Sequence, residues 1–579
     1  VEPPFHQSWN WQFQVPQRHL LVVVFLTAMQ QGYLGMHENN DKWDDFSEAF
    51  EAETHEIDKR QLADLNNTIN YDALDEAAKL SYRLFEYGLK QSIDAYQYRD
   101  HDYPVNQMFG VQSWIPSFLI NVHQVNDTSD AEAYVIRLNG LPDIMKEVVA
   151  DLKQKEEKGV IAPNFALEKG IVQAQNILKG KPFDESEEDN AILSDFKRKV
   201  EALSLDKAQQ IKLIENAQKA LLESFKPAYE SLIAALAAQQ PKAVANGAWS
   251  LPDGTAYYQF SLQQMTTTNM TPDEIHELGL SEVKRIHEEM HEIMKKVGFE
   301  GDLKAFFKHL QDREDMYYPD SDEGRAAALK DATKLIEDFK PQLDKLFKTK
   351  PKADVIVKAV EPFRSSAGKA FYNQPAPDGS RPGTYYVNLT NLKSLPKWEM
   401  AALAYHEGIP GHHMQIAIAQ ELEGLPKFRR FGANYTAYVE GWGLYSEYLP
   451  TEIGMYQDPY DDFGRLSMEL LRACRLVADS GIHHKKWTRE EAIKFMLDSL
   501  PVTEASASRS VERYFVMPGQ ATAYKIGMLK FQALQQKARA ALGDGFDIRE
   551  YHDVALTNGP LPLEILEEQV DQWIASTDG

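Results

Sequence analysis

The amino-acid sequence predicts a mainly α-helical protein, with two helical lobes around a deep cleft and a small β-sheet next to a metal site. Long runs, such as residues 72–96 and 206–240, carry apolar residues at three- and four-residue spacing between strong helix formers. Strand patterns are few and short, near Val357 and from Gly383 to Leu389. With 579 residues, the chain is also too long for one ordinary core, so two lobes are expected.

The first 29 residues are an atypical N-terminal segment. Its nine apolar residues from Leu20 to Ala28 are too few to span a bilayer, which takes roughly 20. Their number matches the hydrophobic part of a signal peptide. However, Glu2 and the aromatic residues before them do not match its start, and Met29 stands where a lipoprotein would have cysteine. We therefore expect either a signal remnant or a buried strand or helix. The expected location is periplasmic or otherwise exported, with the cytoplasm as the alternative.

The boundary between the lobes is placed in the stretch from Gln239 to Gly254, which contains several prolines and glycines. An N-terminal helical lobe is thus expected over residues 30–245 and a catalytic zinc-binding lobe over residues 246–579. A formal net charge of −25 argues against a protein that coats nucleic acid or an anionic membrane. The single cysteine, Cys474, excludes an intramolecular disulfide and a thiolate-rich zinc cluster. The sequence leaves the oligomeric state open.

Two stretches compete for the role of zinc site. The first, HEEMH from His287 to His291, has the spacing at which two histidines on one helix reach the same ion with a glutamate beside it. However, the apolar residues around it form a stripe away from the two histidines, which lie among glutamates and lysines. This pattern is typical of a surface helix, with Thr271 as its N-cap and Pro272 after it. Because a catalytic metal needs a dry cavity, HEEMH is predicted not to bind it.

The second stretch, HEGIPGHH from His406 to His413, lies within residues 400–420, where Glu407 is the only side chain of certain charge. So uncharged a helix is expected to be buried. A lone buried carboxylate is costly unless a metal or another partner compensates its charge. The neighbouring histidines supply a reason for it if they hold a metal ion, so the zinc site is predicted here.

The spacing in HEGIPGHH requires a break in the helix. In a straight helix, His406 and His412 would point to different faces. Pro410 prevents a straight helix because it has no N–H and its ring clashes with the carbonyl of His406. If the break loops out two residues, His412 is the second ligand, and if it loops out three, His413 is. We favour His412 and keep His413 as the reserve ligand or as a partner that orients one.

A third protein ligand is expected, because zinc with two histidines usually takes one more and keeps a position open for water. The apolar, aromatic stretch NYTAYVEGWGLYSEYLPTEIG carries Glu440, which follows His412 by 28 residues. That separation leaves room for one helix and an antiparallel return. Glu447 lies on the same helical face as Glu440 and is expected to orient a ligand.

Four motifs in order, HEGIPGHH, VEGWGLYSE, FGRLSMELLRACRLVADSGIH and VMPGQATAYKIG, resemble the bacterial domain-of-unknown-function family 885. The resemblance extends from about Gln31 to the end of the chain. Members of that family are similar in plan to helical, gluzincin-type zinc metallopeptidases such as thimet oligopeptidase and carboxypeptidase Taq. The resemblance implies zinc held by His406, His412 and Glu440. It also implies Glu407 as the general base, but it does not define a substrate.

The predicted activity is zinc-dependent cleavage of peptide bonds in short peptides, of the oligopeptidase or carboxypeptidase type. Glu407 is expected to take a proton from the attacking water and pass it to the leaving amine. The oxyanion that forms needs a hydrogen-bond donor besides the metal. Since the resembling peptidases use a late tyrosine, Tyr524 is predicted to be that donor.

Residues predicted to contact the substrate are Arg381, Tyr385, His413, Arg513 and Tyr514. Arg381 is suited either to receive a terminal carboxylate, as a bidentate guanidinium does well, or to brace its own turn. The stretch GSRPGTYYVNL, which contains Tyr385, is expected to form an edge strand that pairs with an extended peptide. Arg513 and Tyr514 lie in the stretch VERYFVMPGQATAYKIG, which ends with the last of the four motifs and where further hydrogen-bond donors are expected.

Two other functions compete with a peptidase. A zinc amidohydrolase acting on modified or non-peptide amides would use the same centre, and the sequence does not separate it from a peptidase. A non-catalytic peptide-binding protein would keep the fold without the chemistry. However, it would have no need for a buried base such as Glu407.

Overall fold

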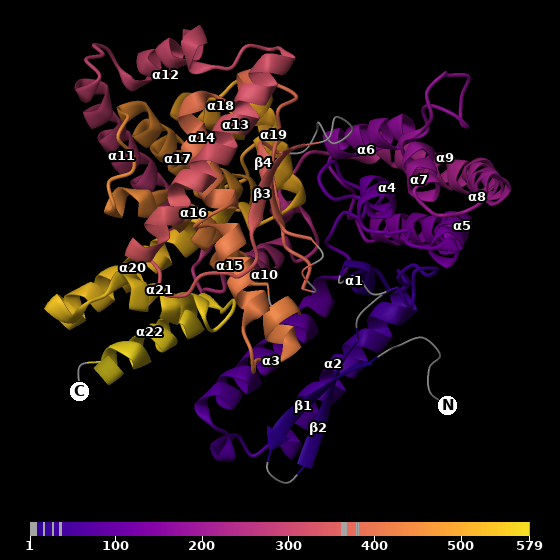
Figure 1. Cartoon of the computed structure of the whole chain (residues 1–579), viewed down its shortest axis with the longest axis horizontal. Coiled ribbons are helices and arrows are strands. Elements are labelled where there is room, and N and C mark those ends of the chain that lie inside the picture. Colours follow the sequence, from indigo (N-terminus) through magenta and orange to yellow (C-terminus); the bar gives the residue numbers. More distant parts are fainter. Residues whose placement is uncertain are drawn as a thin grey trace. The chain divides into compact units, whose positions relative to one another are not determined.

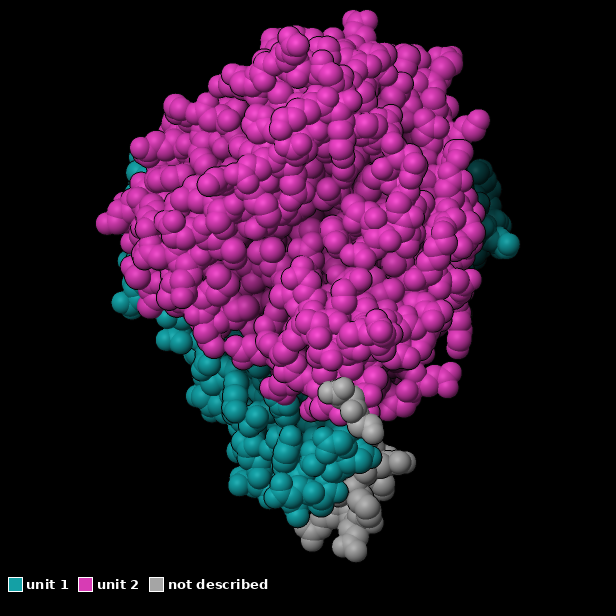
Figure 2. Space-filling view, turned by 90° about the vertical axis from the view of Figure 1, so that its left-hand side faces the viewer, with its two compact units in different colours: residues 1–246, 250–253 teal, residues 247–249, 254–579 magenta. Residues whose placement is uncertain are grey.

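The computed structural model of the chain describes residues 8–15, 18–25, 28–33, 37–360, 368–377, 379, 381–432 and 434–577, with side chains from residue 28 onward. Helices make up most of the described residues (Figure 1), so the mainly α-helical class is confirmed. The chain divides into two compact units, coloured separately in Figure 2: residues 1–246 with 250–253, and residues 247–249 with 254–579. The deep cleft between the lobes stays a prediction.

The first unit consists of helices and a two-stranded antiparallel hairpin. In the hairpin, β1 (Ser8–Val15) pairs with β2 (Arg18–Phe25). The backbone of the apolar stretch Leu20–Ala28 thus belongs to β2 as far as Phe25, whereas its side chains up to residue 27 lie outside the described residues. The helices of this unit are α1 (Ala28–Tyr33), α2 (Glu48–Thr68), α3 (Glu76–Ala95), α4 (Val111–Asn121), α5 (Thr128–Glu157), α6 (Asn164–Ile177), α7 (Ala191–Glu201), α8 (Lys207–Ala220) and α9 (Lys226–Gln239).

The second unit consists of helices and one small sheet. Its helices are α10 (Gly254–Thr266), α11 (Pro272–Lys296), α12 (Leu303–Asp312), α13 (Asp322–Phe339), α14 (Met400–Glu407), α15 (His412–Glu421), α16 (Thr436–Glu452), α17 (Pro459–His483), α18 (Arg489–Ser499), α19 (Glu504–Val516), α20 (Ala523–Leu542), α21 (Ile548–Leu556) and α22 (Leu563–Thr577). Within this unit, α16 packs along α20, and α11 packs along α17. In the part of the chain that the structure describes, no helix is both long and apolar enough to cross a membrane.

The small sheet of the second unit has the strand order β3-β5-β4. β3 (Val355–Ala359) runs parallel to β5 (Gly383–Val387), and β4 (Ala370–Asn373) runs antiparallel to it. The presence of a small sheet is therefore confirmed. The prediction that β5 is an edge strand is wrong, because β3 and β4 pair with both of its sides. An extended substrate cannot pair with a strand whose two edges are already used.

Glycines allow α16 and α20 to approach each other closely. A Cβ atom added to Gly441 would lie 2.5 Å from the Cα atom of Gly527, and one added to Gly527 would lie 1.9 Å from the backbone oxygen of Ala437. Ordinary Cβ contacts are longer than this, so a larger residue at either position would push the helices apart. The close approach matters because α16 carries the motif VEGWGLYSE and α20 begins within the motif VMPGQATAYKIG.

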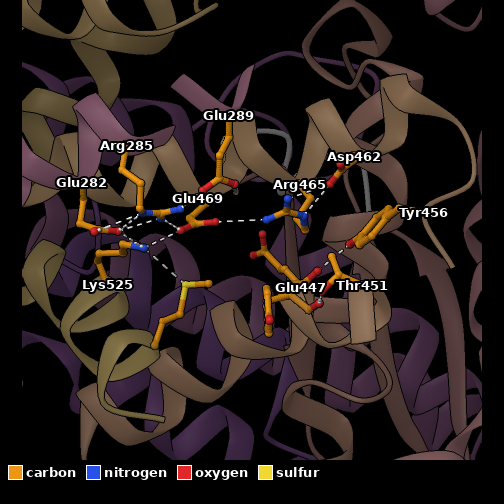
Figure 3. Close-up of polar contacts among 12 residues, drawn as sticks. Glu282, Arg285, Glu289, Glu447, Thr451, Tyr456, Asp462, Arg465, Glu469 and Lys525 are labelled. Atoms are coloured by element: carbon orange, nitrogen blue, oxygen red, sulfur yellow. Dashed lines mark hydrogen bonds and ion pairs between the residues drawn. The ribbon is translucent and has the colours of Figure 1, made fainter. Parts of the chain in front are cut away.

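A buried ionic network joins α11, α17 and α20 (Figure 3). The fully buried Lys525 donates to Glu469 at 2.6 Å and lies 2.9 Å from a carboxylate oxygen of Glu282. Arg285 pairs with both carboxylates, and Arg465 donates to the second oxygen of Glu469 at 3.3 Å. Burial by itself raises the pKa of Glu469, but the three cations around it lower that pKa to about 2. Glu469 therefore stays ionised and holds α17 against its two neighbours.

Lys525→Met should destabilise the second unit, because it leaves Glu282 and Glu469 buried with less compensating charge. Breaking a buried ion pair by removing one partner costs about 3 kcal/mol or more. Urea unfolding of the two proteins measures the difference. The control is Lys530→Met on the same helix, whose pair with Glu567 is partly exposed and is expected to contribute less than about 1 kcal/mol. Equal effects of the two substitutions would contradict a stabilising role for the network.

Candidate metal centre

The helix that carries HEGIPGHH is interrupted, as its proline predicts. α14 ends at Glu407 and α15 begins at His412. In the turn between them, a Cβ atom added to Gly411 would lie 1.9 Å from the backbone oxygen of His406. One added to Gly408 would lie 2.3 Å from a side-chain carbon of α13. The chain thus returns on itself so tightly at Gly411 that only glycine fits there, and a side chain at Gly408 would displace the one from α13.

Two side chains of α16 fix the interrupted turn. The backbone oxygen of Pro410 accepts a hydrogen bond from Trp442 Nε1 at 2.9 Å and another from Ser446 Oγ at 3.3 Å. Both donors are fully buried. A carbonyl freed by a break in a helix needs such partners when no water is at hand. The turn therefore has one defined position on α16.

The break brings the two histidines to one carboxylate. Glu440 Oε2 lies 3.5 Å from His406 Nε2 and 3.4 Å from His412 Nε2. One ligand atom from each of these three residues, which we call the ligand cluster, lies within 4.8 Å of the others. Two imidazole nitrogens and a carboxylate oxygen are a donor set that catalytic zinc takes. The chemistry and the closeness of these atoms fit a divalent metal ion.

His413 points to the sheet and not to the ligand cluster. Its Nδ1 lies 2.9 Å from the hydroxyl of Tyr372, and its Nε2 lies 3.0 Å from the backbone oxygen of Ala353. Burial lowers the pKa of His413 to about 4, so the ring is neutral at ordinary pH. Both ring nitrogens of His413 thus have protein partners. Of the two histidines, His412 is the one that lies beside Glu440.

Two residues of α16 orient the His406 ring. The buried carboxylate of Glu447 lies 2.7 Å from His406 Nδ1, so that Nε2 faces Glu440. A Cβ atom added to Gly443 would lie 2.7 Å from Cε1 of the same ring. Burial by itself disfavours the protonated ring, but hydrogen bonds to Glu440 and Glu447 raise the pKa of His406 to about 10. Glu447 thus has the contact that an orienting residue needs.

Glu407 is buried next to the ligand cluster. Burial raises its pKa, while the charges of His406 and His412 act in the opposite direction. The fully buried Tyr385 of β5 interacts electrostatically with this carboxylate. A carboxylate with a raised pKa accepts a proton more readily than an exposed one, which is what a general base requires.

Tyr524 lies at the start of α20, where two side chains hold its hydroxyl. Arg513 Nη2 donates to the hydroxyl oxygen at 3.3 Å, and Gln520 Nε2 donates to it at 3.4 Å. In both contacts the oxygen is the acceptor. The hydroxyl hydrogen is therefore available to donate to another group, such as an oxyanion.

The turn before Tyr524 is anchored by Asp479 of α17. Gly519 has a φ of 80°, a left-handed conformation that favours glycine. Its N–H donates to Asp479 Oδ1 at 3.1 Å, and the hydroxyl of Tyr258 donates to the same oxygen at 2.6 Å. Burial raises the pKa of Asp479 to about 7, although both hydrogen bonds oppose that rise. Asp479 thus fixes where α20, and with it Tyr524, begins.

Two arginines of α17, absent from the sequence-based prediction, connect Tyr524 with the ligand cluster. The guanidinium carbons of Arg475 and Arg472 lie 4.6 and 5.7 Å from the centre of the Tyr524 ring. Arg475 also interacts electrostatically with Glu440, and Arg472 Nη2 lies 3.8 Å from Glu447 Oε1. Two arginines three residues apart in the apolar stretch LLRACRLVA are the sequence signal that could have identified them.

The remaining predicted substrate contacts are divided between two places. Tyr514 is buried and interacts electrostatically with Arg475, so it lies on the same side as Tyr524. Arg381 is exposed and donates to the backbone oxygen of Gln374 at 3.2 Å. Its guanidinium thus braces the connection between β4 and β5, which is the alternative role predicted for it.

HEEMH lies on α11, which has Thr271 as its N-cap. His287 Nε2 lies 3.0 Å from the backbone oxygen of Ser499, and His291 is exposed. Among the described residues, the ligand cluster is the one group in which three metal-ligating atoms of His, Cys, Asp or Glu come this close together. HEEMH therefore has two histidines at the right spacing but no third ligand atom near them.

Comparisons with known proteins give a family and a fold. Residues 29–570 match a family described as bacterial protein of unknown function (DUF885), and no curated protein matches the chain. The crystal structure of "the putative lipoprotein from Colwellia psychrerythraea" is similar with a TM-score of 0.89 and 30% identity, over 95% of this chain and 96% of that one. The structure of "a putative lipoprotein of unknown function from Shewanella oneidensis" has a TM-score of 0.70 and 18% identity, over 93% and 96% of the two chains.

Gly443→Ala should lower the affinity for zinc by about 10- to 100-fold, the usual effect of disturbing what orients a ligand. The added methyl group would overlap the His406 ring and displace it. Calorimetric titration of the chelator-treated protein with zinc measures the change. The control is Gly88→Ala on α3, an exposed helical position where nothing lies within 4 Å of the added atom. If Gly443→Ala bound zinc as tightly as the control, His406 would not be a ligand.

Proposed function

The chain belongs to the bacterial protein family of unknown function DUF885, and from this premise we propose that it is a zinc-dependent hydrolase that cleaves peptide bonds in short peptides. The observation that carries the proposal is the ligand cluster beside the buried Glu407. Two histidines, a carboxylate ligand and a neighbouring glutamate are also the parts that gluzincin-type zinc metallopeptidases use.

A zinc ion bound to the cluster would polarise the scissile carbonyl and activate water. The chain's own residues would carry the rest of the reaction. Glu407 would accept a proton from the attacking water and later donate it to the leaving amine. Glu447 would keep His406 in the orientation that binding needs, as it does through the 2.7 Å contact.

Tyr524 would stabilise the oxyanion by donating its free hydroxyl hydrogen. Arg513 and Gln520 already hold the hydroxyl oxygen, so the donor needs little rearrangement when charge develops. Arg472 and Arg475 lie near the ring of the same tyrosine and add positive charge on this side. The site would thus have a general base, Glu407, beside the cluster. It would also have a positively charged group of side chains that includes the oxyanion donor Tyr524.

We also propose that the protein is exported. Support comes from the two similar solved proteins, each of which is described as a putative lipoprotein. Fractionation of cells that produce the full-length protein tests this proposal, which requires the protein to be found outside the cytoplasm.

The purified protein should hold about one zinc ion per chain. His406→Ala should abolish both zinc binding and hydrolysis, since a site that lacks one ligand holds its ion poorly. Replacing His287 and His291 together by alanine is the matched control and should leave both properties intact. Metal analysis and incubation with a mixed library of short peptides, with products read by mass, measure them. Zinc lost from the control but kept by His406→Ala would reverse the assignment.

Glu407→Gln should keep the zinc ion but cleave peptides at least about 10²-fold more slowly, the usual size of a general-base contribution. Glutamine has nearly the same volume and cannot take up the proton. Turnover and zinc content are measured on the same preparation. The control is Glu423→Gln, an exposed glutamate after α15, which should change neither quantity. Full turnover by Glu407→Gln would move the base to another residue.

Tyr524→Phe should lower turnover by about 10²- to 10³-fold with unchanged zinc content, because it removes one hydrogen-bond donor to the oxyanion. Tyr448→Phe on α16 is the control, since that hydroxyl donates to Glu452 on the surface. Steady-state kinetics separate the two possible roles of Tyr524. A change confined to KM would make it a substrate-binding residue instead of an oxyanion donor.

A further inference from the structure

Arg475 is a charged side chain without a counter-charge of its own. It is partly buried on α17, and its Nε and Nη1 atoms are shielded from solvent with no hydrogen-bond partner among the described residues. Within the same described part of the chain, no carboxylate lies within ion-pair distance of it. By contrast, Arg465 on the same helix pairs with Asp462 and Glu469. An unpaired guanidinium in a protein interior is costly, so its presence calls for an explanation.

The charges around Arg475 favour the binding of an anion. Glu440, the carboxylate that interacts with it electrostatically over a longer range, is one that a metal ion would use. Arg472 and Arg513 lie near the same tyrosine ring or hydroxyl. When a divalent ion is bound, these three arginines and the ion outweigh the nearby carboxylates of the site. A partly desolvated region with excess positive charge attracts an anionic group of the substrate.

The geometry of Arg475 suits a carboxylate. Its guanidinium lies 4.6 Å from the centre of the Tyr524 ring, a contact that holds a planar cation in place. A guanidinium so held presents two parallel N–H groups, which match the two oxygens of a carboxylate. Arg381, the residue predicted to receive a terminal carboxylate, instead braces its own strand connection through Gln374. Arg475 is therefore the better placed arginine.

We propose that Arg475 binds the C-terminal carboxylate of the peptide substrate, so that the enzyme removes residues from the C-terminal end. This inference rests on the proposed function. Arg475 lies over the ring of Tyr524, the proposed oxyanion donor, so a carboxylate bound to it lies close to the bond that is cleaved. The leaving group would accordingly be only a few residues long.

The first experiment compares three peptides of the same length on the zinc-loaded protein. One has a free C-terminus and neutral side chains, the second is its C-terminal amide, and the third is an amide with an aspartate near the scissile bond. The free acid should be cleaved about 10- to 100-fold more efficiently than either amide, since charge-assisted bidentate hydrogen bonds are involved. Equal cleavage of acid and plain amide, or of acid and aspartate-containing amide, would overturn the assignment to the C-terminus.

The second experiment measures what Arg475 contributes. Arg475→Gln should reduce the preference for the free acid to less than about threefold, while Arg475→Lys should keep part of it because the charge remains. The control is Arg509→Gln, an exposed arginine on α19, which should keep the full preference. If Arg475→Gln lowered cleavage of acid and amide equally, Arg475 would have only a structural role and the inference would be wrong.

A binding measurement separates this inference from the proposed activity. Zinc-loaded Glu407→Gln protein should bind the free acid at least about tenfold more tightly than the amide by calorimetry, and adding Arg475→Gln should remove the difference. If that difference were found but no peptide were hydrolysed by the unaltered protein, the carboxylate site would stand and the proposed function would fail. If peptides were hydrolysed without any such difference in binding, the proposed function would stand and the carboxylate site would fail.

Discussion

The docking of one interrupted turn on one buried helix determines the rest of the site. Trp442 and Ser446 of α16 donate to the oxygen of Pro410, and Glu447 of the same helix meets the His406 ring. These bonds satisfy polar groups that would otherwise be costly in a dry interior. Because α16 also carries Glu440, the contact that closes the turn brings the carboxylate of the ligand cluster to both histidines.

Glycines make this docking possible, and they explain the spacing within VEGWGLYSE. Gly441 lets α16 lie against Gly527 of α20, and Gly443 leaves the space that the His406 ring occupies. Neighbouring positions of the motif thus supply a residue of the ligand cluster, a close helix contact and a donor to the turn. Packed interiors tolerate little added volume, so a methyl group added at either glycine would displace residues of the site.

The buried charges of α17 differ in how they are compensated. Glu469 is surrounded by Lys525, Arg285 and Arg465, so its role is to hold three helices together. Arg475, which lies over the Tyr524 ring, has no carboxylate of its own within ion-pair distance in the described structure. A complete set of partners indicates structural use, whereas a partly buried charge that lacks one is the observation behind the proposed carboxylate site.

Local patterns in the sequence were sufficient for the helical class, the break at Pro410 and the surface position of HEEMH, because periodicity and proline geometry act over a few neighbouring residues. They were not sufficient to place His413 against the sheet, to show that β5 is a central strand, or to identify Arg475. Each of these depends on contacts between segments far apart along the chain. Such contacts come from the packing of whole helices and strands, and the local spacing of residues does not predict that packing.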